Sequence, residues 1–337
     1  MSNDPFLLGG GHRAAMAVEM AARPEIQWSL APATSLEASA AIVHRQYLTR
    51  YGGFFNGRAQ LRMRHRDSEY LSLDARLAYA REFPTDALTD SADFAIDSIS
   101  LRETFSARAS LDWSPDALTS VTTSVGWESL DYPDSKLLVP TRALNGDVDF
   151  SRRLSETTSL GLHADVTRTQ ATASGTVSAR SMRATIEHEL GPGVSVNGQV
   201  GAEWADALAG GEGPRIAGST SLCYRPPSTD ACLSASIQSE ISGFGGLQRQ
   251  LYVGGTFRRQ ISERSSLGLV TDYRTTSMSR GAGRATALRL SGTFERRLTG
   301  VLSLIGAVGY FCRRSLTGER NEALVLEVGI SIRGNRR

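Results

Sequence analysis

Two cysteines carry the sharpest chemical signal in this sequence of 337 residues. Cys223 and Cys232 flank the turn-forming stretch Pro226–Asp230, and each alternates with apolar neighbours. If the flanks are paired strands, both thiols lie on the polar face, opposite each other and close enough to bond. An oxidising compartment would favour that bond. We therefore predict a disulfide between Cys223 and Cys232, the alternative being two small unpaired residues.

The residue types that perform catalysis or bind metals do not combine into a recognisable site. His163 and Asp165 are two residues apart on one polar face. A solvated face explains the pair more simply than catalysis or metal binding does. Glu187, His188 and Glu189 are not followed by a second histidine at helical spacing, and no phosphate-binding or nucleophile motif occurs. We predict a protein that is not an enzyme and that needs no cofactor or metal ion.

Charged residues recur along the polar faces of the predicted strands. Arg58, Arg62 and Arg64 form the most concentrated row, which could guide an anionic polymer as charged rings select ions in pores. The alternative that we favour is neutralisation by neighbouring carboxylates, notably Asp74. The residues predicted to line a water-filled interior are Arg58, Arg62, Arg64, Asp74, Arg76, Arg108, Asp147, Asp149, Arg183, Glu187, Asp272, Arg274 and Arg289.

The overall charge balance excludes one broad class of function. The 37 basic and 35 acidic residues leave a net charge of +2, without the basic excess of a nucleic-acid-binding protein. Mean hydropathy is −0.21, and no apolar run is long enough to form a transmembrane helix. Residues 1–26 also lack the basic start, apolar core and cleavage site of a signal peptide.

A period of two dominates the chain and predicts β-strands. Between Thr119 and Trp127, one face carries threonine, valine and tryptophan, while the other is polar. Strict alternation of this kind indicates a sheet with one apolar face. About seventeen such segments occur, near residues 12–30, 35–50, 55–66, 68–82, 98–113, 118–131, 142–154, 158–170, 177–190, 194–206, 214–226, 231–243, 247–260, 266–278, 284–297, 301–315 and 321–333.

The connections between these segments alternate between short turns and longer links. Short turns such as 155–157 and 191–193 recur along the chain, with longer links such as 83–97 between them. Each segment also has the roughly 9–11 residues that a tilted strand needs to cross a membrane. Together these features predict an antiparallel transmembrane β-barrel with short periplasmic turns and longer extracellular loops. A soluble β-sandwich is the alternative.

The number of segments raises a question about the first strand. Seventeen strands would leave the first and last running in the same direction, whereas bacterial barrels have even strand numbers. We expect eighteen strands, with one missing at the N-terminus, or sixteen if one segment is miscounted. Residues 1–337 are predicted to form a single barrel domain of about 16–18 strands, with residues 1–11 irregular.

Three stretches resemble a known group of proteins. Residues 57–82 (GRAQLRMRHRDSEYLSLDARLAYARE), 110–133 and 149–168 are similar to outer-membrane β-barrel proteins associated with bacterial exopolysaccharide secretion systems. This resemblance implies an outer-membrane exit channel for an exopolysaccharide. A periplasmic polysaccharide export protein would be its partner, and outer-membrane lipid would surround it. No residue role is transferred, because the group has no catalytic motif.

The sequence therefore predicts a passive pore in the outer membrane of a Gram-negative bacterium. An exopolysaccharide exit channel is the preferred function. A general or solute-specific porin is the alternative, and a barrel enzyme or a structural surface protein comes after it.

Overall fold

The computed structural model describes residues 15–48, 52–82, 100–171, 175–206, 213–242, 246–277, 284–315 and 318–332. Within these ranges the secondary structure is entirely β, and no helix is long and apolar enough to span a membrane. The strands are β1 (Ala17–Ala22), β2 (Glu25–Ala31), β3 (Thr34–Tyr47), β4 (Gly53–Arg66), β5 (Leu71–Glu82), β6 (Arg102–Trp113), β7 (Thr119–Asp131), β8 (Thr141–Ser155), β9 (Thr158–Ala171), β10 (Gly175–Gly191), β11 (Val194–Ala205), β12 (Arg215–Tyr224), β13 (Thr229–Ser242), β14 (Gly246–Ser262), β15 (Ser265–Ser277), β16 (Arg284–Arg297), β17 (Leu302–Arg314) and β18 (Arg320–Ile332).

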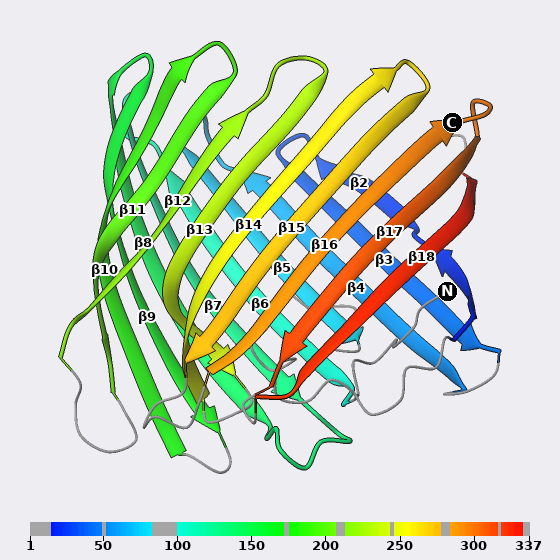
Figure 1. The fold of residues 1–337 in the computed structure, drawn as a ribbon. Helices are drawn as coiled ribbons and strands as arrows, with labels where there is room; N and C mark the ends of the chain where they lie inside the picture. The colour runs from blue at the N-terminus through cyan, green and yellow to red at the C-terminus, as the bar shows by residue number, and fades with distance from the viewer. Residues whose placement is uncertain are drawn as a thin grey trace.

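All 18 strands belong to one antiparallel sheet, which confirms the predicted fold class, and their number lies within the predicted range. From β3 to β18, each strand pairs with the next one along the chain. The sheet curls so that β12 to β18 form one wall and β3 to β7 form the opposite wall (Figure 1). Consecutive pairing follows from the short connections, which favour hairpins.

The first predicted segment, 12–30, is divided into two strands in the structure. Both β1 and β2 pair with β3, one after the other, and the break lies at Arg23 and Pro24. Proline has no N–H to donate, so it interrupts a strand where a ladder hydrogen bond is due. The Pro24 carbonyl still accepts a hydrogen bond from the Ala40 N–H at 3.0 Å. The eighteen strands therefore occupy seventeen positions across the sheet, because β1 and β2 share one.

The two edges of the sheet run in the same direction. An even number of antiparallel ladders separates β2 from β18, so the two strands are parallel to each other. Among the described residues, no residue-by-residue ladder joins β18 to β1 or β2, and the barrel is open along this line. The additional N-terminal strand stays a prediction, and the segment 1–11 lies outside the described residues.

One end of the barrel carries only short connections. We call this the short-turn end; it includes the turns at 32–33, 156–157 and 192–193. Gly193 has a φ of 75°, a left-handed conformation that glycine adopts without steric cost. The opposite end, here the long-loop end, carries the connection 132–140 and those that include residues outside the described ranges. The predicted alternation of short turns and longer links is confirmed for the described connections.

Candidate functional site: the interior face of the barrel

Strand alternation separates the sheet into an apolar and a polar face. The ladder between β4 and β5 places Leu61 opposite Leu77. At the adjacent position, Arg62 lies opposite Arg76. We call the face that carries Leu61 the outer face, and the face that carries Arg62 the interior face. The ladders carry this alternation from each strand to the next around the sheet. On this basis, all thirteen residues that the sequence predicts to line the interior lie on the interior face.

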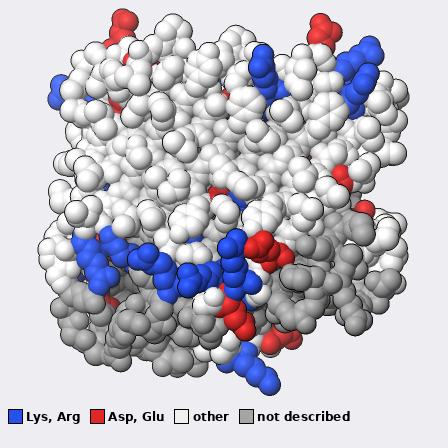
Figure 2. Space-filling view, viewed as in Figure 1, with Lys and Arg blue, Asp and Glu red and all other residues white. Residues whose placement is uncertain are grey.

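The outer face has the properties of a surface in contact with lipid. Large apolar side chains remain exposed there, among them Val125 (54%), Val200 (63%) and Ile330 (68%). Figure 2 shows a broad band with few charged side chains across the middle of this face, with more charged groups above and below it. Such a band is too large for the surface of a soluble monomer and fits the apolar band of a membrane barrel.

All four tryptophans lie on this outer face, toward the strand ends. Trp28 and Trp113 are near the short-turn end, and Trp127 and Trp204 are toward the long-loop end. Their exposed fractions lie between 39% and 49%. Aromatic rings with a polar N–H gather where hydrocarbon meets water, so the tryptophans mark two interfaces.

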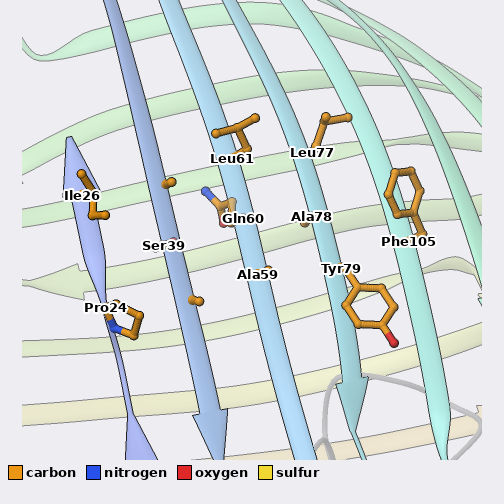
Figure 3. A pocket seen from close by; sticks show the side chains of 12 residues that line it. Pro24, Ile26, Ser39, Ala59, Gln60, Leu61, Leu77, Ala78, Tyr79 and Phe105 are labelled. Carbon is orange, nitrogen blue, oxygen red and sulfur yellow. The ribbon is translucent and has the colours of Figure 1, made fainter. Parts of the chain in front are cut away.

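A shallow apolar groove crosses the outer face beside the break between β1 and β2. Pro24 and Ile26 line one side of it, and Leu77, Tyr79 and Phe105 line the other (Figure 3). Its volume is about 400 Å³. The groove is apolar and opens outward, so it belongs to the surface in contact with lipid and not to the interior.

The interior face carries an unusual row of arginines across three adjacent strands. Arg76 on β5 lies directly opposite Arg62 on β4 and directly opposite Arg108 on β6. Like charges that face each other across a ladder destabilise a sheet, and opposite charges are the ordinary arrangement. A row of three cations therefore favours an anion bound or passing beside it. We call Arg62, Arg76 and Arg108 the arginine row.

Nearby carboxylates neutralise this row only in part. Asp74 accepts hydrogen bonds from Arg62 Nε at 2.5 Å and from Arg64 Nε at 3.4 Å, so one acid serves two arginines. Arg108 Nη2 lies 2.6 Å from Asp147 Oδ1. Arg76 is exposed, and no ion pair with a described carboxylate is found for it. The positive charge of Arg76 therefore faces the interior uncompensated by a direct partner.

A cavity of about 880 Å³ lies over these residues at the short-turn end. Its lining comes from β2 to β6 and includes Arg62, Arg64, Arg66, Arg76 and Arg108, with Asp74 and Asp112 as the acids. Five arginines against two aspartates give the lining a net positive charge at neutral pH. An anionic group would be attracted to this cavity and would find bidentate donors in it.

The other predicted interior residues form ion pairs or hydrogen bonds between neighbouring strands. Arg58 Nη2 lies 2.7 Å from Glu82 Oε2. His163 lies between two acids, with Nδ1 2.7 Å from Asp149 and Nε2 3.1 Å from Asp165. This places His163 and Asp165 in a polar network along the interior wall.

The remaining predicted residues lie on β10, β15 and β16. Arg274 Nη1 contacts Glu240 at 3.0 Å and Gln250 at 2.8 Å. Asp272 accepts a hydrogen bond from the Tyr252 hydroxyl, and Arg289 stacks over the ring of Phe311. Glu187 is exposed on β10, opposite Asn197. The charged side chains thus continue around the interior wall, away from the arginine row.

The interior narrows between β10 and β13. Arg183 on β10 is only 10% exposed, and its Nη2 contacts Asp165 at 2.5 Å. Its Nη1 lies 3.4 Å from Gln238 Oε1 on β13. These two strands are not neighbours in the sheet, so the contact crosses the interior. The backbone of β14 also lies close to β9 and β10, so opposite walls of the barrel approach each other here.

Side chains from opposite walls pack more closely at the long-loop end than they do around Arg183. Leu130, Tyr132 and Leu138 are at most 3% exposed and pack with Ile241 of β13. Thr141 Oγ1 donates a hydrogen bond to the Ser242 carbonyl at 3.5 Å. The connection 132–140 therefore lies against the end of β13, on the far side of the interior. Part of the barrel is filled there, while the cavity at the short-turn end stays open.

Cys223 and Cys232 lie directly opposite each other in the ladder between β12 and β13. The structure joins them in a disulfide, with Cα atoms 4.1 Å apart. Both are on the interior face, beside the short turn at 225–228. The third cysteine, Cys312, is free and lies on the outer face of β17.

Several interior residues were not singled out by the sequence analysis. Glu203 is 4% exposed, and it accepts hydrogen bonds from the Ser239 N–H at 2.9 Å and from the Ser239 hydroxyl at 2.5 Å. Its alternation with Gly201 and Gln199 was the signal that could have placed it on the interior face. No such signal exists for Gln238, because its partner Arg183 belongs to a distant strand. Within the described residues, no cluster of side chains suited to a metal ion is found.

Comparisons with known proteins identify the fold and no family. No known family matches the sequence, and no curated protein matches it. A mutant ferric enterobactin receptor from Pseudomonas aeruginosa, in complex with enterobactin, superposes with a TM-score of 0.55 and 10% identity, over 96% of this chain and 72% of that one. Another mutant of the receptor gives a TM-score of 0.51 and 9% identity, over 94% of this chain and 69% of that one.

The chain is shorter than these solved structures. It spans 60% of the length of the FrpB iron transporter of Neisseria meningitidis, which it matches over 89% of its own length with 11% identity and a TM-score of 0.47. At such low identities the likeness concerns architecture alone. Together with the band of exposed apolar side chains, it shows that this chain has the fold and outer surface of a Gram-negative outer-membrane β-barrel protein.

Proposed function

We propose that this protein is a passive outer-membrane channel that favours anionic solutes. The observation that carries the proposal is Arg76, which faces Arg62 and Arg108 across two ladders and has no ion pair with a described carboxylate. Burying or opposing like charges costs stability unless an anion offsets the repulsion. A channel lined in this way concentrates anions beside the arginine row.

The architecture supports transport in general. The outer face is apolar, the interior face is charged, and a cavity of about 880 Å³ opens at the short-turn end. In a barrel of this type the short turns face the periplasm, so the cavity would be the periplasmic mouth. The similar solved structures are outer-membrane transporters and receptors, and they give no support for an enzyme.

The exopolysaccharide exit channel is retained as a second candidate. Residues 57–82, which carry part of the resemblance to secretion-associated barrels, include Arg62, Arg64, Asp74 and Arg76 of the cavity lining. An acidic polysaccharide would present repeated carboxylates to the arginine row. A periplasmic polysaccharide export protein would then meet the barrel at the short-turn end.

The test is the ion selectivity of the refolded protein in a planar bilayer under a salt gradient. Wild-type protein is expected to prefer chloride over potassium. R76Q should lower this preference, and D74N should raise it, because Arg62 and Arg64 lose their shared acid. R81Q is the matched control, since Arg81 lies on the outer face of the same strand, beside Glu103 at 3.4 Å.

An acidic polysaccharide added on either side separates the two candidates. Block by the polymer from the short-turn side, lost in R76Q, would favour the exit channel. Anion selectivity without block would favour a small-solute channel. Cation selectivity in the wild type, or equal selectivity in R76Q and D74N, would contradict the role of the arginine row.

A further inference from the structure

Arginines also gather on the outer face, at the long-loop end. Arg142 on β8, Arg168 on β9 and Arg180 on β10 share the outward parity of Leu144, Val166 and Met182. All three are exposed. We call these three residues the outer triad.

The ladders bring the three residues of the outer triad together. Arg142 lies opposite Gln170, two residues from Arg168 on the same strand. Arg168 lies opposite Ser178, which is two residues from Arg180. Each arginine is therefore the diagonal neighbour of the next, at a spacing of about 7–8 Å between positions, which long side chains bridge. Three cations can thus converge on one ligand.

No described carboxylate forms an ion pair with the outer triad. Two acids lie at diagonal positions beside it, and each accepts a hydrogen bond from another group: Asp131 from the Tyr132 N–H and Asp206 from the Ser178 hydroxyl. Several interior arginines differ in this respect, since Arg58, Arg62, Arg108, Arg183 and Arg274 each have a carboxylate partner. Three arginines beside these two acids leave the outer triad with a net positive charge and with guanidinium groups that no carboxylate holds directly.

The position of the outer triad matches the depth of lipid headgroups. Arg180 lies between Val166 on β9 and Trp204 on β11, which are 49% and 44% exposed. The triad is therefore at the boundary where the apolar band ends and an aromatic ring marks the interface. Guanidinium groups at that depth meet phosphates, which they bind through two parallel N–H donors.

From this arrangement we propose that the outer triad binds the headgroup phosphates of an anionic lipid in the outer leaflet. The lipid's acyl chains lie against Leu144, Val166 and Met182, and its phosphates are held by Arg142, Arg168 and Arg180. This assignment rests on the proposed orientation, with the long-loop end outward. It is independent of conduction through the interior, so the channel can fail its test while the lipid site stands.

The experiment is native mass spectrometry of the detergent-solubilised full chain with diphosphorylated lipid A. Wild-type protein is expected to retain the lipid, and removal of both phosphates from the lipid should weaken binding at least tenfold. The triple variant R142Q/R168Q/R180Q should show the same loss with the phosphorylated lipid. R152Q is the matched control, because Arg152 lies on the same face of β8 near the other end, and its binding should stay within twofold of wild type.

Two further measurements test whether the site requires the whole lipid and whether the variants are folded. Inorganic phosphate at the lipid's concentration should not compete, because the proposal requires the acyl chains as well. Heat-modifiable migration on electrophoresis shows whether the triple variant is folded; if it is not, the three single variants are compared, each expected to weaken binding measurably. Equal binding of phosphorylated and dephosphorylated lipid, or unchanged binding in folded variants, would overturn the proposal.

Discussion

Arg76 stands directly opposite Arg108 in the ladder between β5 and β6, with both side chains on the interior face. The Arg62 position lies on the other side of Arg76, so a cation faces Arg76 from each neighbouring strand. Cross-strand pairs of opposite charge stabilise a sheet, and like pairs oppose it. The arrangement has a cost in stability, which is expected where charge serves a function.

The repulsion between Arg76 and its two arginine neighbours leads to the first prediction. R76Q should increase the free energy of unfolding by about 0.2–1 kcal/mol, because it removes two like-charge contacts. The gain should shrink at high salt, which screens the repulsion. Urea titration of the refolded protein in detergent micelles, followed by tryptophan fluorescence, measures both effects. R81Q, at an outward position beside Glu103, should bring no gain. A loss of stability in R76Q would show that the row is not repulsive.

The disulfide gives the second prediction. The intact mass of the native protein should be two hydrogen masses below that of the reduced protein. Replacing Cys223 and Cys232 with serine should lower the free energy of unfolding by about 2–3 kcal/mol, the loop-closure contribution for a loop of this length. C312S should change neither the mass difference nor the stability by a comparable amount, because Cys312 is free. A native mass equal to the reduced mass would contradict the bond.

Hairpin pairing explains why local features could be predicted from the sequence. Cys223 and Cys232 are nine residues apart across one turn, so alternation alone places them opposite each other on one face. The same reasoning places Arg62 and Asp74 together, because they lie in one hairpin. Period-two alternation sets the face, and the turn sets the register.

Contacts across the interior could not be predicted from alternation and turn positions. Arg183 and Gln238 are 55 residues apart and belong to strands that are not neighbours. Their approach depends on how strongly the sheet curls, which arises from twist summed over many strands. The packing of Leu138 near Ile241 has the same origin. The division of the first segment at Pro24 was readable in principle, since proline disfavours a strand interior.

The turn between β6 and β7 gives a prediction of pH dependence. Asp116 Oδ1 accepts hydrogen bonds from the N–H groups of Leu118 and Thr119, each at 2.7 Å. The Leu118 bond is the main cause that lowers the pKa of Asp116 below its ordinary value. A lowered pKa means that the turn gains stability from ionised Asp116 above the unfolded pKa, and loses it as the pH falls through the folded pKa.

Carboxyl-carbon NMR of the refolded protein in micelles should therefore show Asp116 titrating below an unperturbed aspartate. In L118P, which removes the Leu118 N–H, the pKa of Asp116 should rise toward its ordinary value. A wild-type Asp116 that titrates at the ordinary value would contradict the hydrogen bonds seen in this turn.

The last prediction concerns the contact that narrows the interior. Arg183 bridges Asp165 on β9 and Gln238 on β13, so its side chain occupies the space between non-neighbouring strands. R183A should raise the single-channel conductance, because it removes a large side chain from the constriction. It should also lower stability by about 3–5 kcal/mol, since Asp165 loses its buried cation. Q238A should raise conductance less and cost less, because it leaves the ion pair with Asp165 in place. If R183A folds and conducts no better than wild type, current must pass along the arginine row beside β4 to β6, and the constriction between β10 and β13 does not limit it.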